Sequence, residues 1–595
     1  MAGRPRRPPA ENPAALGFTR QPMVRWLSPG ELVRTAKQVV LSGIFGTFSD
    51  KREIQAALAA SQVHDFSRRD EIWIDYVADL GDGFDSTFTV ASCLASPTLD
   101  LAAPAGGGDG SSSGDVVGPG GVQHTKRGSI LVMGGDQVYP SASVREYENR
   151  LVGPYRAALP YTEADHPALF AIPGNHDWYD GLTAFLRVFC QQSWVGGWTT
   201  RQQRSYFAIE LPARWWLWGI DVQFDTYIDA PQLAFFRDVE LAEGDNVIVC
   251  SAKPTWVEAN HDNPEAFVTL DYFERKVVRD RGARVRLSLA GDAHHYAHYV
   301  GADNDEHRIT AGGGGAYLSG THQLPELLVL PPAASKDPGK TTSVARYERT
   351  ACYPTAARSR RLRFGVWRLP VKNPSFWALV GAVHLLYAGI IYSANRRPGA
   401  GFGQTLSELS FLSTLSGTVG SPLGLVVTAI IGSGLAGFTK APDATRKWPV
   451  GLSHTGAHLF VIAAVVFASS RALSSLDGAA LMVGFAVGVG VVGGLLGSWV
   501  MALYLAVADA LFGFNTNELF AAQRIEDAKN FLRIRVGADG VVRVYPVAVD
   551  RVGRDWRLRS SPAPTDDEPW FVAGRPPTPA RLIEGPITLT GRRPR

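Results

Sequence analysis

The stretch Leu131–Asp136, Leu-Val-Met-Gly-Gly-Asp, is followed further along the chain by Pro173–Asp177, Pro-Gly-Asn-His-Asp. Each is typical of a hydrophobic strand that ends at glycine and is followed by a carboxylate, an amide or an imidazole. A layered α/β fold presents functional side chains in this way, from the carboxyl ends of its strands. The two stretches therefore predict strand ends that direct ligands toward a common site.

Other hydrophobic segments extend this pattern. Glu71–Ala78 is rich in aromatic and β-branched residues and ends at Asp79-Leu80-Gly81, and a further such end is Gly291-Asp292-Ala293-His294. We expect strands also at Ala168–Ile172, Ser205–Leu211, Trp215–Asp221, Asn246–Cys250 and Val285–Ala290, with a helix at Ser143–Leu159. Strands at this spacing, with helices between them, predict a layered sheet protein of the α/β class.

The composition excludes several classes of function. A chain of 595 residues is too long for a single core, and a net charge of +3 without a long basic stripe argues against a nucleic-acid polymer as partner. The four cysteines form no Cys-x-x-Cys pair, which indicates free thiols in a reducing compartment. Residues 1–12 have no apolar run of signal-peptide length, so we expect the first domain to stay in the cytoplasm.

The side chains at the strand ends are suited to binding divalent metal ions. Asp79, Asp136 and Asn175 offer hard oxygen donors, and His294 offers an imidazole nitrogen. A divalent ion lowers the pKa of bound water, and two ions that share a carboxylate can hold both the attacking and the leaving oxygen. The pattern therefore indicates phosphoester hydrolysis.

The order Asp-x-Gly, Gly-Asp, Gly-Asn-His-Asp and Gly-x-x-His resembles the calcineurin-like metallophosphoesterase superfamily over roughly residues 70–325. The first of these motifs is similar to that of the purple acid phosphatase branch. The resemblance implies a four-layer α/β/β/α metallophosphoesterase sandwich. In this chain an α-helical transmembrane domain and a small C-terminal β-containing segment would follow it.

The resemblance also implies roles for single residues. Asp79 and His294 would bind a first metal ion, Asp136 would bridge two ions, and Asn175 would bind the second.

Two further residues gain roles from the same motif. His176 would lie outside the coordination shell and protonate the leaving oxygen, with Asp177 orienting its ring. The reaction implied is hydrolysis by a metal-activated water or hydroxide.

Three positions depart from the family pattern. Gly81 and Ala252 stand where the family has histidines, and Asp292 replaces the first histidine of the last motif, where it becomes a candidate metal ligand. Oxygen in place of nitrogen favours manganese or magnesium over zinc or iron, with two ions expected. Asp82, His261 and His295 are candidates to replace the missing ligands.

Two features fit a phosphate pocket. Arg204 precedes a strand and could form a fork onto phosphate oxygens, although an ordinary surface arginine is an equal alternative. The glycine run within Ala311–Tyr317 has no side chains for chemistry, but its backbone could approach the metals or the substrate.

Four long apolar runs indicate an integral membrane protein. None of them contains Asp, Glu, Lys or Arg: Phe376–Ala394, Phe411–Phe438 (which includes Pro422), Val450–Ser470 and Gly478–Ala508. Each is long enough to cross a hydrocarbon core of about 30 Å. The last run exceeds one crossing and could be one tilted helix or a hidden pair, so four or five spans remain open.

Basic residues set the expected orientation. They crowd between Arg358 and Lys372 and again at Lys440, Arg446 and Lys447, whereas the alternate loops hold only Arg396, Arg397 and Arg471. The positive-inside rule therefore predicts a multi-pass protein of the cell membrane whose N-terminal catalytic domain and C-terminus are both cytoplasmic.

The chain is thus expected to divide into six parts. These are an N-terminal helical extension (1–69), the metallophosphoesterase domain (70–330, with a disordered insertion at 102–128), a basic linker (331–375), a transmembrane domain of about four helices (376–508), a cytoplasmic amphipathic helix and β segment (509–559), and a disordered tail (560–595). Within the last two, Thr516–Leu532 is expected to be helical.

Two functions are compatible with these features. The first is a membrane metallophosphoesterase acting on a phosphomonoester or phosphodiester, either lipid-linked or a nucleotide. The second is a membrane sensor or transporter whose phosphoesterase-like domain binds metal or nucleotide with weak catalysis. The missing histidines favour the second, and the His176-Asp177 pair favours the first.

Overall fold

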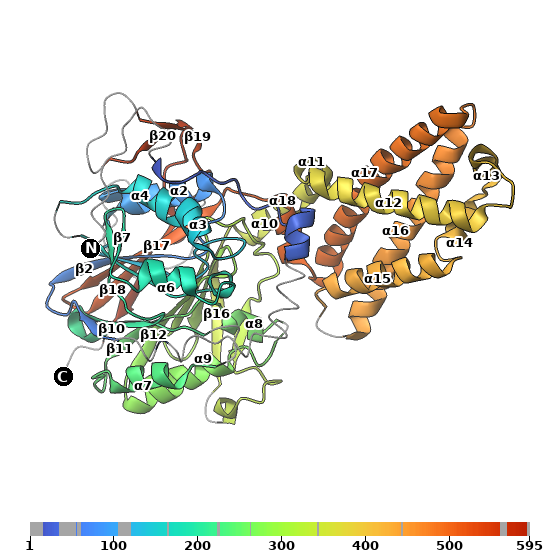
Figure 1. The fold of residues 1–595 in the computed structure, drawn as a ribbon. Coiled ribbons are helices and arrows are strands. Elements are labelled where there is room, and N and C mark those ends of the chain that lie inside the picture. The colour runs from blue at the N-terminus through green and yellow to red at the C-terminus, as the bar shows by residue number, and fades with distance from the viewer. Residues whose placement is uncertain are drawn as a thin grey trace. The chain divides into compact units, whose positions relative to one another are not determined.

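The structure is a computed structural model that describes residues 16–34, 55, 61–104, 121–163, 166–222, 227–261, 263–341, 344–441, 444–559 and 568–591. The chain forms two units (Figure 1). The first comprises Met1–Val24, Gln38–Ser359 and Arg524–Arg595, and the second comprises Arg25–Lys37 and Arg360–Gln523. The first unit is mixed α/β with two large sheets, and the second is helical.

One sheet of the first unit holds most of the predicted strand ends. Its order is β21-β18-β17-β2-β5-β6-β8-β7, with β22 also paired to β18. The bounds are β2 Glu71–Val77, β5 Ile130–Met133, β6 Ala168–Ala171, β7 Trp194–Val195, β8 Trp198–Thr200, β17 Lys529–Gly537, β18 Val541–Val549, β21 Arg581–Leu582 and β22 Ile587–Thr590. The strands β2, β5, β6 and β8 are parallel, which brings the carboxyl ends of β2, β5 and β6 to one edge.

The other sheet has the order β1-β9-β10-β11-β12-β14-β13-β16-β15. Its strands are β1 Val63–Asp65, β9 Phe207–Leu211, β10 Trp215–Gly219, β11 Asn246–Cys250, β12 Arg284–Ala290, β13 Tyr296–Gly301, β14 His307–Ala311, β15 Leu327–Leu330 and β16 Ala345–Tyr353. The predicted strands therefore exist within a residue or two. In addition, the N-terminal extension contributes β1 and the basic linker contributes β16.

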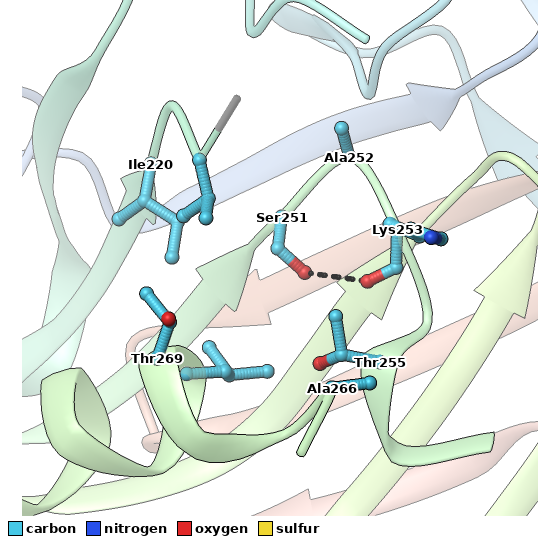
Figure 2. A pocket seen from close by; sticks show the side chains of 9 residues that line it. Ile220, Ser251, Ala252, Lys253, Thr255, Ala266 and Thr269 are labelled. Carbon is cyan, nitrogen blue, oxygen red and sulfur yellow. Dashed lines mark hydrogen bonds between the residues drawn. The ribbon is translucent and has the colours of Figure 1, made fainter. Parts of the chain in front are cut away.

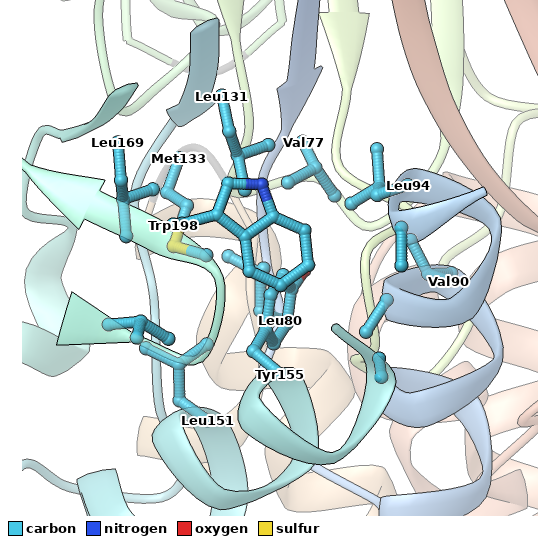
Figure 3. Packing of buried hydrophobic residues seen from close by; sticks show 14 of the residues in the cluster. Val77, Leu80, Val90, Leu94, Leu131, Met133, Leu151, Tyr155, Leu169 and Trp198 are labelled. Carbon is cyan, nitrogen blue, oxygen red and sulfur yellow. The ribbon is translucent and has the colours of Figure 1, made fainter. Parts of the chain in front are cut away.

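Helices cover the outer face of each sheet. Against the first sheet, Trp198 and Tyr155 lie in an apolar cluster with α2 (Phe84–Ala95), α4 (Gly153–Ala158) and α6 (Thr183–Phe189) (Figure 3). Against the second, Trp218 packs with α7 (Ala230–Asp238) and α9 (Val268–Phe273). The two sheets contact each other, because the Phe170 and Phe207 rings lie 5.0 Å apart.

The C-terminal segment departs from the sequence predictions. The helix expected over Thr516–Leu532 ends early, as α18 (Thr516–Gln523), and the chain then enters β17, which pairs with β2. Apolar and charged residues alternate with period two from Leu532 to Val536, which is typical of a strand and not of a helix. Strands β17 and β18 are therefore part of the sheet that contains β2 and do not form a separate unit.

Part of the tail predicted to be disordered forms strands. β20 (Phe571–Arg575) pairs with β19 (Arg554–Leu558), and β21 and β22 pair with β18. Partner strands supply the apolar contacts that the Pro/Arg-rich composition lacks on its own. Residues 560–567 and 592–595, and residues 105–120 of the insertion, lie outside the described residues.

A buried ion pair fixes β17 against β2. Arg533 Nε donates to Asp75 Oδ1 at 2.9 Å, and both side chains are almost fully buried. The same guanidinium donates to the carbonyls of Cys93 and Ser96 at the end of α2, both at 3.2 Å. Burial raises the pKa of the Asp75 carboxyl, and the Arg533 charge opposes this.

Among its described residues, the second unit contains three helices long and apolar enough to cross a membrane. They are α12 (Pro374–Asn395), Thr445–Ala472 within α16 (Ala444–Ala472), and α17 (Gly478–Phe512). The predicted second span is broken into α14 (Phe411–Gly417) and α15 (Pro422–Phe438), bent by 73°. Pro422 lies at the start of α15, where its missing N–H costs nothing. α17 is one continuous helix, so the described residues of this unit hold three helices that could cross a membrane, or up to four candidate spans if the bent pair counts as one.

Replacing Arg533 with methionine leaves Asp75 buried without its partner. We expect the free energy of unfolding of the first unit to fall by about 3–5 kcal/mol. Thermal unfolding of the purified chain followed by circular dichroism measures this as a lower midpoint. Arg575→Met is the matched control, because it removes only an exposed pair with Asp555 and should leave the midpoint unchanged. An unchanged midpoint in Arg533→Met contradicts the role of the pair.

Candidate active site

The four predicted strand ends meet at one edge of the first unit. Asp79 follows β2, and the backbone N–H groups of Asp292 and His294, after β12, donate to its carboxylate oxygens at 2.9 and 3.3 Å. Asp136 follows β5, and the N–H of His176, after β6, donates to its Oδ1 at 2.9 Å. Segments that are far apart in the sequence are thus joined through two carboxylates.

Asn175 directs its amide group at Asp136. With its nitrogen turned inward, the amide would donate to the two carboxylate oxygens of Asp136 at 3.3 and 3.1 Å. With its oxygen turned inward, the Asn175 amide oxygen faces the two carboxylate oxygens of Asp136, and a cation stabilises such a group of oxygens. Either orientation keeps Asn175 in contact with Asp136, as the sequence predicts.

Tyr139 belongs to the site although sequence reasoning missed it. Its hydroxyl lies 3.1 Å from Asp136 Oδ2 and 3.0 Å from His294 Nε2, so it joins two of the predicted metal ligands. Its ring also lies 4.4 Å from that of His176, centroid to centroid. The phenol is fully buried and adds one more oxygen donor. Its place three residues after Asp136 was the available signal.

Several of these residues adopt backbone conformations that L side chains rarely occupy. The φ angles of Asp79, Asp136, Asp292 and His294 are 58°, 52°, 65° and 51°. Each such conformation costs on the order of 1–3 kcal/mol and is retained only where the surroundings enforce it. These four strained residues lie at the ends of β2, β5 and β12, where the site is formed.

Glycines bring the backbone against the carboxylates. A Cβ at Gly312 would lie 2.1 Å from Asp79 Oδ2, and one at Gly174 would lie 2.1 Å from Asp136 Oδ1. Gly81 is equally enclosed, because a Cβ there would lie 2.5 Å from the Gln137 carbonyl oxygen. No side chain fits at position 81, so the histidine of the family pattern is excluded here by backbone packing.

The loop after β11 reaches the site but presents a methyl group. Ala252 lies against Gly135 and Gly291, and its carbonyl accepts from the Gly291 N–H at 3.1 Å. Ser251 and Ala252 line a cavity of about 20 Å³ beneath this loop, room for roughly one water molecule and too small for a phosphoester (Figure 2). The neighbouring Lys253 pairs with Glu258 at 2.7 Å, and its charge opposes part of the rise that burial causes in the pKa of Asp136.

The partner predicted for His176 is different in the structure. His176 Nδ1 lies 2.8 Å from the Pro140 carbonyl oxygen, which orients the ring. Asp177 instead accepts hydrogen bonds from the Gly174 and Gln137 N–H groups, at 2.9 and 3.2 Å, and from the Tyr147 hydroxyl at 2.5 Å. Asp177 therefore holds the loops that carry Asn175 and Asp136 and does not orient the imidazole.

The other sequence candidates are less closely connected to this centre. Arg204 donates to the Tyr206 hydroxyl at 2.7 Å and is almost fully buried, so its role as a phosphate ligand stays a prediction. Asp82 is buried and accepts from the Val24 N–H at 2.7 Å. His295 is buried and contributes its backbone carbonyl to Gly312, whereas His261 is exposed.

Charge within the site is poorly compensated. Burial and the charges of Asp136 and Asp292 raise the pKa of Asp79 well above its usual range. Burial raises the pKa of Asp136 to about 6, and burial with the Asp136 charge raises that of Asp177 to about 8. Burial lowers the pKa of His294, so its imidazole is neutral and can donate an electron pair.

These residues fit a divalent cation. Carboxylate, amide and phenol oxygens with one neutral imidazole are donors for manganese or magnesium, and the repelling carboxylates need positive charge. In the described part of the chain, no three His, Cys, Asp or Glu side chains are already grouped around one point. Asn175 and Tyr139 would supply the remaining donors to such an ion.

Comparison with known proteins adds no assignment. No protein-family model matches the chain, and no curated protein matches it at a significant level of similarity.

We expect the stability of the metal-free protein to depend on pH. A carboxyl whose pKa is higher in the folded than in the unfolded chain stabilises the fold below its unfolded pKa of about 3.9, and this contribution is lost as the pH rises through the folded pKa. With the pKa of Asp136 at about 6 and that of Asp177 at about 8, the midpoint of thermal unfolding in chelator should fall between about pH 4 and about pH 8.

Added Mn²⁺ should raise that midpoint more at about pH 8 than at about pH 5, because at low pH protons compete with it for the carboxylates. Asp136→Asn is the control and should reduce both the pH dependence and the Mn²⁺ effect. A Mn²⁺ effect of equal size at both pH values would argue against a metal site at these carboxylates.

Proposed function

We propose that this chain is an integral membrane metallophosphoesterase that hydrolyses a phosphomonoester or phosphodiester. The observation that carries the proposal is the convergence of Asp79, Asp136, Tyr139 and His294 through contacts of 3.3 Å or less, with His176 beside them. The arrangement of layers is compatible with the α/β/β/α sandwich of the calcineurin-like superfamily. The motif resemblance supports the same assignment.

The metal ligands would be Asp79, Asp136, Asn175, Tyr139 and His294, with Asp292 close enough to raise the pKa of Asp79. Bound divalent ions, two in the family pattern and manganese or magnesium by donor type, would supply an activated water and balance the charge of the phosphate. Because Gly81 and Ala252 provide no nitrogen ligands, Tyr139 replaces part of the missing donor set.

His176 would deliver the proton to the leaving oxygen. Its Nδ1 faces the Pro140 carbonyl oxygen, so Nδ1 carries a hydrogen and Nε2 is the nitrogen that exchanges a proton with substrate. Burial lowers the pKa of His176 to about 4, while the Pro140 carbonyl and the Asp292 charge oppose this. The negative charge of a bound phosphate would raise this lowered pKa of His176, so protonation of the ring would accompany substrate binding.

The apolar helices would place this site at a membrane. Basic residues before α12 and between α15 and α16 favour a multi-pass protein of the cell membrane with both termini in the cytoplasm. A phosphoester that is lipid-linked fits this location, and a soluble nucleotide is the alternative substrate class.

A second function is favoured by the helical unit. His384 and His454 are buried there, and neither ring nitrogen of either residue has a hydrogen-bond partner among the described residues. His384 also lines a cavity of about 160 Å³ with Tyr387, Thr455 and His458, in otherwise apolar surroundings. Such a site would suit a membrane sensor or transporter whose phosphoesterase-like unit binds metal with little turnover.

Hydrolysis of an aryl phosphate and of a bis-aryl phosphodiester with Mn²⁺ separates the two functions. His176→Ala should lower kcat by about 10²–10⁴-fold, because it removes the proton donor while leaving the metal ligands in place. His124→Ala is the matched control, since His124 is exposed and pairs only with Asp100 on the surface. Absence of Mn²⁺-dependent turnover in the wild type, or turnover unaffected by His176→Ala, would refute the proposed enzymatic function.

A further inference from the structure

Lys529 is a lysine with no exposed surface, at the first position of β17. Lysine is almost never fully buried unless it is paired. In the register of β17 against β2, Leu532 lies opposite Tyr76 and Arg533 opposite Asp75, so Lys529 follows on toward the end of β2, where Asp79 begins the site. A residue beyond the last membrane helix thus reaches the centre of the first unit.

The Lys529 ammonium group donates to the carbonyl of Ala316. Ala316 belongs to the glycine run that passes beside Asp79: its own N–H donates to the Asp79 carbonyl at 2.9 Å, and the Gly314 N–H donates to the Ala78 carbonyl at 2.9 Å. The adjacent Asn530 N–H donates to the Gly313 carbonyl at 3.1 Å. Lys529 and Asn530 of β17 therefore both bind the glycine run, which in turn is hydrogen-bonded to the backbone of Asp79.

The position of this loop decides where the Asp79 carboxylate lies. Gly312 leaves no room between its backbone and Asp79 Oδ2, so a displaced loop would move the carboxylate or collide with it. The charge of Lys529 also reaches the site, because it is one of the causes that lower the pKa of His294, after burial. The charge of Asp79 in turn raises the pKa of Lys529 against the larger effect of burial, so Lys529 and Asp79 also interact through their charges. The hydrogen bond of the Lys529 ammonium group, however, is made to the loop and not to Asp79 or His294.

A role in stability alone does not account for an ammonium group at this position. Burying a charged group costs several kcal/mol even after relaxation, and an apolar side chain of similar length avoids that cost. Burial lowers the pKa of Lys529 to about 8, the sign of such a cost, while the charge of Asp82 opposes the shift. The hydrogen bond to Ala316 is the specific contact that an apolar side chain cannot replace.

We propose that Lys529 is a positioning residue of the active site, which holds the glycine run Gly312–Ala316 and through it the Asp79 carboxylate. The inference rests on the proposed function and deepens it: the site is complete only when the segment that follows the membrane helices is docked as β17.

The test compares Lys529→Met and Lys529→Arg in the full-length chain. Three quantities are measured: kcat for an aryl phosphate with saturating Mn²⁺, Mn²⁺ affinity by calorimetry, and the midpoint of thermal unfolding in chelator. Lys529→Met should lower kcat at least tenfold and weaken Mn²⁺ binding at least tenfold, with a midpoint equal to or above that of the wild type. Lys529→Arg should recover part of both, because its guanidinium can still donate to the carbonyl.

Val536→Ala is the matched control, since Val536 is buried on the same strand near its other end. It should lower the midpoint without changing kcat or Mn²⁺ affinity. Tighter Mn²⁺ binding by Lys529→Met with unchanged kcat would show that Lys529 acts only as a repelling charge, and would overturn the positioning role. A lower midpoint with unaltered kcat and Mn²⁺ affinity would overturn it too.

The calorimetric measurement also separates this inference from the proposed function. A wild-type chain that binds Mn²⁺ but hydrolyses neither ester refutes the enzyme, and the Lys529 inference is then decided by Mn²⁺ affinity alone. A wild-type chain that binds no Mn²⁺ refutes both.

Discussion

The first unit depends on the contact between Asp75 and Arg533, which joins strands separated by the whole membrane segment of the sequence. A buried charge without its partner is strongly destabilising. A different register of β17 on β2 would separate Arg533 from Asp75 and leave both charges unpaired in an apolar layer. The pair therefore selects one register of β17 on β2. That register places Lys529 and Asn530 at the glycine run and extends the sheet on which the site is formed.

The site itself is closely packed around its carboxylates. Glycines at positions 174 and 312 let the backbone approach the oxygens of Asp136 and Asp79, and four ligand-bearing residues accept left-handed backbone conformations. The same crowding leaves no room for a side chain at position 81, because the Gln137 carbonyl oxygen would lie 2.5 Å from its Cβ. Tyr139 then supplies an oxygen close to His294.

Local patterns were sufficient to predict much of this arrangement. The strands β2, β5, β6 and β12 are short apolar runs followed closely by glycine or a carboxylate, and each lies where its pattern indicates. Parallel pairing then brings Asp79, Asp136 and Asn175 to one edge without further information. The helical runs of the second unit were similarly evident, because helices of soluble domains rarely lack charged residues over such lengths.

Other features depend on contacts that no local pattern contains. The pairing of β17 with β2 is decided by Arg533 and Asp75, and the same residues in isolation fit a separate hairpin. The ring of His176 is oriented by the backbone carbonyl of Pro140, a contact that no sequence pattern indicates. Asp177, the neighbour in sequence, instead accepts hydrogen bonds from the Gly174 and Gln137 N–H groups. Strands β20 to β22 exist because partners cover them, although their composition is that of a loop.

The position of β17 in the chain also has a consequence for biosynthesis. Domains fold during synthesis from the N-terminus onward, yet β2 lacks one neighbour until Lys529–Gly537 has left the ribosome, after every apolar helix has been made. Until then one edge of β2 is open and Asp75 lacks its partner. Completion of the sheet is therefore coupled in time to synthesis of the membrane helices, and a chain interrupted within them would carry the site residues without the strand that assembles them.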